Sequence, residues 1–193
     1  MTHDDYPDAF IRKVLTGTKT IALLGASAKE NRPSFFVLKY LLARGYRMLP
    51  VNPGLAGQQI AGCEVFASLA DIAEPIDMVD MFRNASYAPD VLDEMLALPV
   101  RPKVLWMQLG VRDDATAARA EENGIAVVMN RCPKIEYGRL SSEISWMGVN
   151  SRTLSSKRPP APAGGQRLSL GRITTAGGGL AQKPGDATED DRS

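Results

Sequence analysis

Histidine is almost absent from this chain, whose 193 residues include one, His3. A Ser/His/Asp triad, a Cys/His dyad, a histidine metal site and a phosphohistidine relay each need a histidine beside the reacting group. We expect His3 to lie in a mobile, solvated N-terminus without a role. The sequence therefore assigns no catalytic residue and no metal site.

Cysteine, net charge and long apolar runs are also scarce. Cys63 and Cys132 stand in no C-x-x-C or Cys/His cluster, which excludes a zinc site and a disulfide framework and fits a reducing compartment. The formal net charge is +1, so the charge balance gives no support for binding duplex DNA. No run of about 18 apolar residues and no signal peptide is visible. We expect a cytoplasmic protein that binds neither nucleic acid nor a membrane.

Short apolar runs alternate with helical patterns along the first 150 residues. Strands are expected at 20–24, 46–51, 76–82, 103–108 and 124–130. Helices are expected at the N-terminus up to Gly17, from Pro33 to Gly45, and at 66–74, 88–98 and 113–123. In the second helix, Phe36, Val37, Tyr40 and Leu41 should share one face. This order predicts an α/β fold, a Rossmann-like, doubly wound, five-stranded parallel sheet.

The composition changes after Asn150, and no aromatic residue follows Trp146. The final segment is rich in Gly, Pro and Ser and cannot bury enough apolar surface to offset its ordering entropy. We therefore divide the chain into a folded domain over residues 1–150 and a disordered tail over 151–193. Ile144, Trp146 and Met147 are expected to pack an extension onto the domain.

The loops that follow the strands should carry the chemistry, because ligands of open parallel sheets bind beyond the carboxyl ends of the strands. In the first loop, Gly25 allows a sharp turn, and Ala26 and Ser27 allow close approach to the next helix N-terminus. Arg32 and Ser34 flank Pro33 there. The loop suits a phosphate, but small residues are equally typical of tight strand-to-helix packing without a ligand.

The second strand argues against ordinary nicotinamide cofactors. The strand ends in "PVNPG" without the acidic residue that accepts ribose hydroxyls in NAD sites, and the first loop lacks G-x-G-x-x-G. An NADP site would need an arginine nearby, and none stands between Arg47 and Arg83.

Three further side chains have both a chemical and a structural interpretation. Asp77 and Asp80 resemble a pair of acid/base carboxylates, but we expect Asp77 to begin a strand and Asp80 to fix backbone N–H groups of a neighbouring loop. Cys132 follows the last strand, without a histidine to activate it. It is interpreted as a small loop side chain, with a mixed disulfide to a thiol ligand as the alternative.

Five loop motifs together resemble the small bacterial CoA-binding-domain proteins, stand-alone relatives of the CoA-binding domain of the succinyl-CoA synthetase α subunit. The motifs are "IALLGASAKENRPS", "GYRMLPVNPG", "IDMVDMFR", "KVLWMQLGV" and "VVMNRCPKIE", in family order over about residues 8 to 140. The resemblance implies bound coenzyme A or acyl-CoA. It places the phosphates near Gly25, Ala26, Ser27, Arg32 and Ser34. By the same resemblance Val51, Asn52 and Pro53 line the adenosine, Phe82 and Arg83 close a wall, and Gln108, Gly110 and Cys132 lie towards the pantetheine.

The expected function is non-catalytic binding of CoA or acyl-CoA, as a sensor or carrier that works with an unidentified protein partner. The synthetase works through a phosphorylated histidine on a second domain, and this chain has neither. The alternatives are a nucleotide-dependent enzyme, either an NAD(P) dehydrogenase or a CoA-ligase accessory subunit, and an interaction protein that keeps the fold without a ligand.

Overall fold

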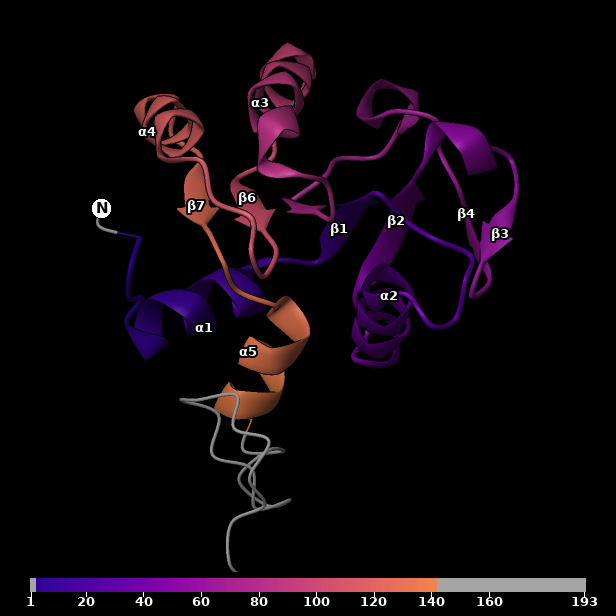
Figure 1. Cartoon of the computed structure of the whole chain (residues 1–193), viewed down its shortest axis with the longest axis horizontal. Coiled ribbons are helices and arrows are strands. Elements are labelled where there is room, and N and C mark those ends of the chain that lie inside the picture. Colours follow the sequence, from indigo (N-terminus) through magenta and orange to yellow (C-terminus); the bar gives the residue numbers. More distant parts are fainter. Residues whose placement is uncertain (1–2, 142–193) are drawn as a thin grey trace, which may run out of the picture. The chain divides into compact units, whose positions relative to one another are not determined.

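Five parallel strands form the centre of the computed structural model, which describes residues 3–141. They are β1 (Thr20–Leu24), β2 (Arg47–Val51), β5 (Met78–Met81), β6 (Val104–Met107) and β7 (Ala126–Val128), in the spatial order β2-β1-β5-β6-β7. The order reverses between β1 and β5, so the topological switch point lies there. The doubly wound parallel sheet predicted from the sequence is confirmed (Figure 1).

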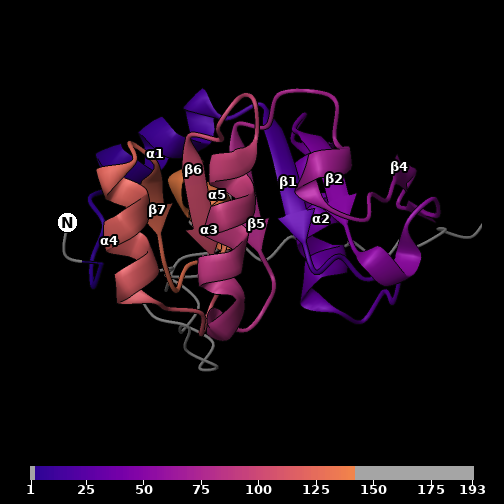
Figure 2. The same ribbon diagram turned by 90° about the horizontal axis from the view of Figure 1, so that it is seen from above.

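Helices cover both faces of this sheet. On one face lie α1 (Asp8–Gly17), α2 (Pro33–Ala43) and α5 (Pro133–Leu140), and on the other lie α3 (Ala88–Ala97) and α4 (Asp114–Glu122), as Figure 2 shows from above. Pro33, Pro89 and Pro133 each stand in the first turn of a helix, where a missing N–H costs nothing. The alternation of strand and helix along the chain therefore produces a three-layer domain.

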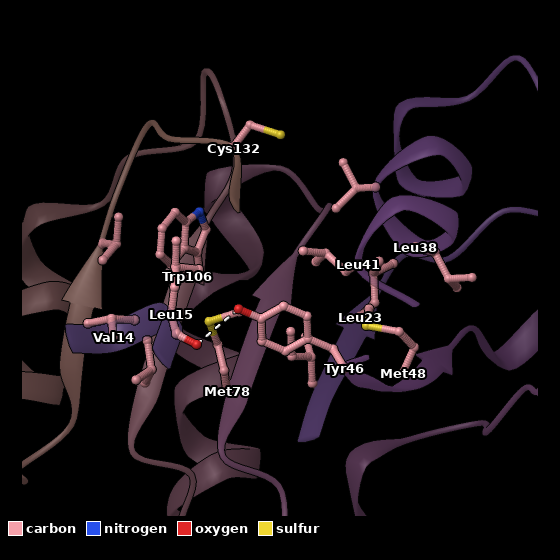
Figure 3. Packing of buried hydrophobic residues seen from close by; sticks show 14 of the residues in the cluster. Val14, Leu15, Leu23, Leu38, Leu41, Tyr46, Met48, Met78, Trp106 and Cys132 are labelled. Atoms are coloured by element: carbon pink, nitrogen blue, oxygen red, sulfur yellow. Dashed lines mark hydrogen bonds between the residues drawn. The ribbon is translucent and has the colours of Figure 1, made fainter. Parts of the chain in front are cut away.

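The core between the sheet and the helices α1, α2 and α5 explains why the strand sequences are uninterrupted apolar runs. Leu23, Met78 and Trp106 have no exposed surface and meet buried residues of α1 and α2 (Figure 3). The Tyr46 hydroxyl donates a 2.9 Å hydrogen bond to the Leu15 carbonyl, which joins α1 to the start of β2. Both faces of the sheet are thus buried, as in other parallel sheets.

The segment 66–74 is not the predicted helix. Phe66 makes a parallel bridge to Val51 at the end of β2, and one 3₁₀ turn, Leu69–Asp71, follows. Its N-terminal capping box uses the side chains of Ser68 and Asp71. Because the sheet edge takes the backbone hydrogen bonds of Phe66, the helical turn cannot extend backwards.

Other sequence predictions also need correction or lie beyond the described residues. Phe36 is 53% exposed, whereas Leu38 is fully buried, so α2 turns Val37, Leu38 and Leu41 towards the sheet. A short hairpin of β3 (Gln59–Ile60) and β4 (Cys63–Glu64) and the helix α5 were not predicted. The predicted tail, the boundary at 150 and the predicted packing of Ile144, Trp146 and Met147 fall on residues outside 3–141.

His3 is buried, contrary to the prediction of a solvated residue. Its Nδ1 lies 2.9 Å from the Tyr6 hydroxyl, and its Nε2 lies 3.6 Å from a carboxylate oxygen of Glu121. The Tyr6 hydroxyl in turn accepts a 2.7 Å hydrogen bond from the N–H of Met129. Residues 3–8 therefore pack along the end of β7 because long-range hydrogen bonds, which local sequence does not reveal, hold them.

Candidate functional site

The loops at the switch point enclose a cleft of about 460 Å³. We call it the switch-point cleft; its lining residues are Gly25, Ala26, Ser27, Arg32, Pro33, Ser34, Asn52, Phe82 and Arg83. All of these except Pro33 were predicted as ligand contacts from the sequence. The carboxyl ends of three adjacent strands, β2, β1 and β5, bring them together.

Glycine is required at the floor of this cleft. Gly25 has φ +82°, and a Cβ built there would lie 2.7 Å from the Phe82 carbonyl oxygen. The loops after β1 and β5 therefore approach closely because position 25 has no side chain. At Gly25 the floor of the cleft is bare backbone.

Backbone hydrogen bonds fix the shape of the floor. The N–H groups of Gly25 and Ala26 both donate to the Val51 carbonyl, at 3.0 and 3.2 Å. Asn52 donates from Nδ2 to the Ala26 carbonyl at 2.7 Å and accepts from the N–H of Gly54 at 2.9 Å. The N–H groups of Gly25 and Ala26 are thus engaged, and anion binding would fall to other donors.

Those donors come from the start of α2. Ser34 is the second residue of the helix, where the N–H has no partner within the helix, and its buried hydroxyl also lines the cleft. Arg32 precedes the helix and is exposed. On the opposite wall the Arg83 guanidinium lies over the Tyr87 ring, 5.6 Å from its centroid. A helix N-terminus between two arginines is an environment that favours anions.

The other predicted contacts lie outside the cleft. Val51 is buried at the end of β2, and Pro53 is exposed in the turn that follows Asn52. Gln108 follows β6 and is buried, and the N–H of Gly110 donates to Asn130 Oδ1 at 2.8 Å. Cys132 lines a separate cavity. The predicted set is therefore divided between the switch point and the far end of the same edge.

Asp80 is a fully buried carboxyl group near the end of β5. Its Oδ1 accepts a 2.8 Å hydrogen bond from Gln108 Nε2, and its Oδ2 has no partner among the described residues. Burial raises the pKa of Asp80 to about 8, although the Gln108 hydrogen bond acts to lower it. The prediction that Asp80 fixes backbone N–H groups is wrong. Asp77 does so instead, accepting from the N–H groups of Lys19 and Thr20.

The second cavity on this edge has a volume of about 620 Å³. We call it the α5 pocket; it is lined by Asp5, Tyr6, Pro7, Asp8, Ile11, Leu109, Asn130, Arg131, Cys132, Ile135, Glu136 and Arg139. Apart from the loop "NRCP", no sequence motif indicated this pocket, because its walls come from segments more than 120 residues apart.

Cys132 is 7% exposed at the start of α5. Burial raises the pKa of its thiol above the ordinary value, and the N–H of Ile135 offsets part of the increase. The thiol is therefore protonated near neutral pH and is a poor nucleophile.

Comparisons with known proteins agree with this geometry. The family model described as "CoA binding domain" matches residues 19–138. The chain belongs to the CoA-binding domain family. The resemblance noted from the loop motifs is confirmed, and both cavities lie on the edge where doubly wound folds bind their ligands.

Relatives of this CoA-binding domain protein include uncharacterized protein YneT of Bacillus subtilis, which is 33% identical over 129 residues, 67% of this chain and 93% of YneT. The α subunit of an ADP-forming acetate–CoA ligase from Pyrococcus furiosus is 31% identical over 86 residues, 42% of this chain and 19% of the subunit. The ligase subunit is thus a much longer protein.

Solved structures show the same fold. A Thermus thermophilus protein is 44% identical, with a TM-score of 0.66 over 70% of this chain and 99% of that one. A hypothetical protein from Pyrococcus horikoshii OT3 is 35% identical, with a TM-score of 0.66 over 72% of this chain and 94% of that one.

The residues 3–141 hold no cluster of three or more His, Cys, Asp or Glu side chains that suits a metal ion. None of their helices is both long enough and apolar enough to cross a membrane.

Proposed function

We propose that this chain binds CoA or an acyl-CoA thioester in the cytoplasm and does not transform it, acting as a sensor or carrier for a protein partner. The switch-point cleft is the observation that supports this most directly. It combines a floor that is bare backbone at Gly25 with a helix N-terminus and two arginines. Those features suit the phosphates of a CoA nucleotide.

The proposed contacts follow the edge of the sheet. Gly25, Ala26 and Ser27 form the floor under the phosphates, with Arg32 and Ser34 as donors. Val51, Asn52 and Pro53 line the adenosine, and Phe82 and Arg83 close the opposite wall. Gln108, Gly110 and Cys132 face the pantetheine arm, which would run from β5 towards β7.

The environments of the chemically reactive groups support binding without catalysis. The chain's single histidine is buried beside Tyr6 and Glu121, so it does not line the switch-point cleft. The Cys132 thiol is buried, and the raised pKa keeps it protonated at neutral pH. Neither group is therefore prepared to act as a base or nucleophile.

An accessory role in a CoA ligase is the second candidate. The identity of 31% to part of an acetate–CoA ligase α subunit favours it over a dehydrogenase. A nicotinamide enzyme is the weaker alternative because β2 ends in Val51, Asn52 and Pro53, without a carboxylate for the ribose. Co-purification with a ligase chain would favour the accessory role.

The test is thermal unfolding of the full chain with CoA, acetyl-CoA, NAD, NADP or ATP at equal concentrations. A ligand at a hundred times its Kd adds about 2.7 kcal/mol of stability. For a protein of this size each kcal/mol raises Tm by roughly 2 to 4 °C. We expect CoA and acetyl-CoA to raise Tm by several degrees and the other nucleotides to have little effect.

The other outcomes decide between the remaining functions. An increase with NAD or NADP alone would replace the proposal with the dehydrogenase. No increase with any of the five would indicate an interaction protein that has kept the fold without a ligand.

A further inference from the structure

The α5 pocket has a wall that the matched family region does not supply. Asp5, Tyr6, Asp8 and Ile11 precede residue 19, where the match to the family model begins. The Tyr6 hydroxyl and the ion pair of Asp8 with Arg139, at 2.5 Å, hold this wall in place. The N-terminal segment thus encloses the end of the sheet edge beyond Cys132.

Two charged side chains face each other in this pocket without a direct hydrogen bond. Arg131 Nε and Glu136 Oε1 are 3.9 Å apart, too far for a hydrogen bond. A hydroxyl oxygen beside this pair can lie about 2.8 Å from both atoms, where it would accept from the arginine and donate to the carboxylate.

The surroundings hold both partners in position. Glu136 is 8% exposed, and its Oε2 accepts two hydrogen bonds from Arg139, at 3.0 and 2.8 Å, which leaves Oε1 for the pocket. Arg131 uses Nη1 and Nη2 on the carbonyls of Asn130 and Asp4, which leaves its Nε–H. The Trp106 indole N–H also donates a 2.8 Å hydrogen bond to the Arg131 carbonyl, which fixes the backbone at this residue.

The charge of the lining disfavours an anionic group. Asp5, Asp8 and Glu136 outnumber Arg131 and Arg139, so a second carboxylate in the pocket would meet net repulsion. An apolar group would remove solvent from the Nε–H and Oε1 without replacing its hydrogen bonds. The pocket therefore suits a small, uncharged group that both donates and accepts hydrogen bonds.

We propose that the α5 pocket receives the acyl end of the ligand and selects a short hydroxyacyl group through a hydroxyl that hydrogen-bonds to both Arg131 and Glu136. The inference rests on the proposed binding of CoA esters, which places the thiol end near Cys132, a residue of this pocket's wall. A volume of about 620 Å³ accommodates a short acyl group together with the end of the arm.

The test is calorimetric titration of the full chain with 3-hydroxybutyryl-CoA, butyryl-CoA, succinyl-CoA and free CoA. These three esters have acyl chains of equal carbon number and differ in polar groups. We expect the hydroxyacyl ester to bind about tenfold tighter than butyryl-CoA, the effect of a hydrogen bond to charged groups, and succinyl-CoA to bind more weakly than the hydroxyacyl ester.

Variants connect the preference to the pocket. Arg131→Met should abolish the preference for the hydroxyl, and a thermal unfolding transition like that of the wild type shows that the variant is folded. Glu136→Gln should reduce the discrimination against succinyl-CoA. Arg101→Met, at an exposed position before β6 on the opposite edge, is the matched control and should keep the wild-type order.

Equal affinity for the hydroxyacyl and butyryl esters, or a preference that survives in Arg131→Met, would overturn the inference while leaving the proposed binding of CoA intact. If none of the four ligands binds, the proposed function fails and the inference fails with it.

Discussion

The two cavities on the carboxyl edge of the sheet are built differently. The switch-point cleft is made from short loops at adjacent strand ends, and its floor is bare backbone at Gly25. The α5 pocket is made from side chains of distant segments, joined by ion pairs and by the Tyr6 hydroxyl. Backbone that holds a phosphate tolerates many sequences, whereas a side-chain pocket changes with each substitution. The first cavity thus suits the constant part of a ligand and the second its variable part.

Replacing Gly25 should have the largest effect and should act on the switch-point cleft. In Gly25→Ala the methyl group meets the Phe82 carbonyl at 2.7 Å while φ is +82°, so the two loops must separate. We expect a loss of about 3 kcal/mol or more in the free energy of unfolding, measured in urea, and loss of CoA binding.

Gly45→Ala separates the steric contact with Phe82 from the backbone strain of a positive φ. Gly45 has φ +87°, but a Cβ there has no neighbour within 4 Å. The substitution should therefore cost about 1–2 kcal/mol, for backbone strain alone, and leave CoA affinity unchanged. Equal losses in the two variants would mean that close approach of the loops does not matter.

The difference between the cavities also explains what the sequence could predict. Gly25, Asn52 and Arg83 lie in loops that follow strands, and the apolar runs of those strands are easily recognised in the sequence. Parallel topology brings the loops after neighbouring strands to the same edge of the sheet, whatever their exact residues. The switch-point cleft was therefore accessible to motif reasoning. Even in this cleft, sequence reasoning did not predict that the N–H groups of Gly25 and Ala26 donate to the Val51 carbonyl, because these hydrogen bonds depend on how β1 and β2 are paired.

The α5 pocket was not accessible in this way. Its construction depends on His3 and Tyr6 packing against β7 and on Arg139 reaching Asp8, contacts that no local pattern signals. The helix α5 was missed because "PKIEYGRL" is short and only weakly amphipathic. The β3–β4 hairpin has strands of two residues each, too short for an alternating pattern.

Asp80 lies on β5, whose carboxyl end borders the switch-point cleft, and its substitution should show a pH-dependent effect. The folded-state pKa is about 8, compared with an ordinary value of 3.8, so folding takes up a proton between these values. The contribution of Asp80 to stability is therefore fully present below about pH 4 and is lost as the pH rises to about 8. An asparagine side chain does not titrate. The free energy of unfolding of Asp80→Asn should therefore rise relative to that of the wild type by up to about 1.4 kcal/mol per pH unit in this range.

Asp77 directly precedes the same strand, and its effect on stability should depend on pH in the opposite direction. Both Asp80→Asn and Asp77→Asn are unfolded in urea across the pH range to compare their free energies of unfolding with that of the wild type. Burial alone would raise the pKa of Asp77, but the N–H groups of Lys19 and Thr20 and the charge of Lys103 lower it overall. Its stabilisation is present above about pH 4 and is lost in acid, so Asp77→Asn should be less stable than wild type by a constant amount between about pH 5 and 9. A parallel pH dependence for the two variants would contradict the assignment of Asp80.

Arg32 tests the charge at the switch-point cleft. If its guanidinium pairs with a phosphate, Arg32→Ala should weaken CoA binding by about 1.5–3 kcal/mol, the range for hydrogen bonds to charged groups. The difference between 3-hydroxybutyryl-CoA and butyryl-CoA should stay the same, because we propose that the acyl end binds in the other cavity. Calorimetry that gives equal CoA affinity for Arg32→Ala and wild type would remove Arg32 from the site.

The two cysteines provide the mildest test, because it needs no substitution. Burial raises the pKa of both thiols, but Cys132 lines the α5 pocket, whereas Cys63 lies on β4 of the hairpin, outside both cavities. At neutral pH both should react slowly with iodoacetamide and with CoA disulfide, because the thiolate is scarce. Bound hydroxyacyl-CoA should slow the labelling of Cys132 further and leave Cys63 unchanged, as read by peptide mass spectrometry. Equal protection of both cysteines would indicate general stiffening of the domain, and rapid formation of a CoA adduct at Cys132 would show that ligand binding exposes and ionises the thiol.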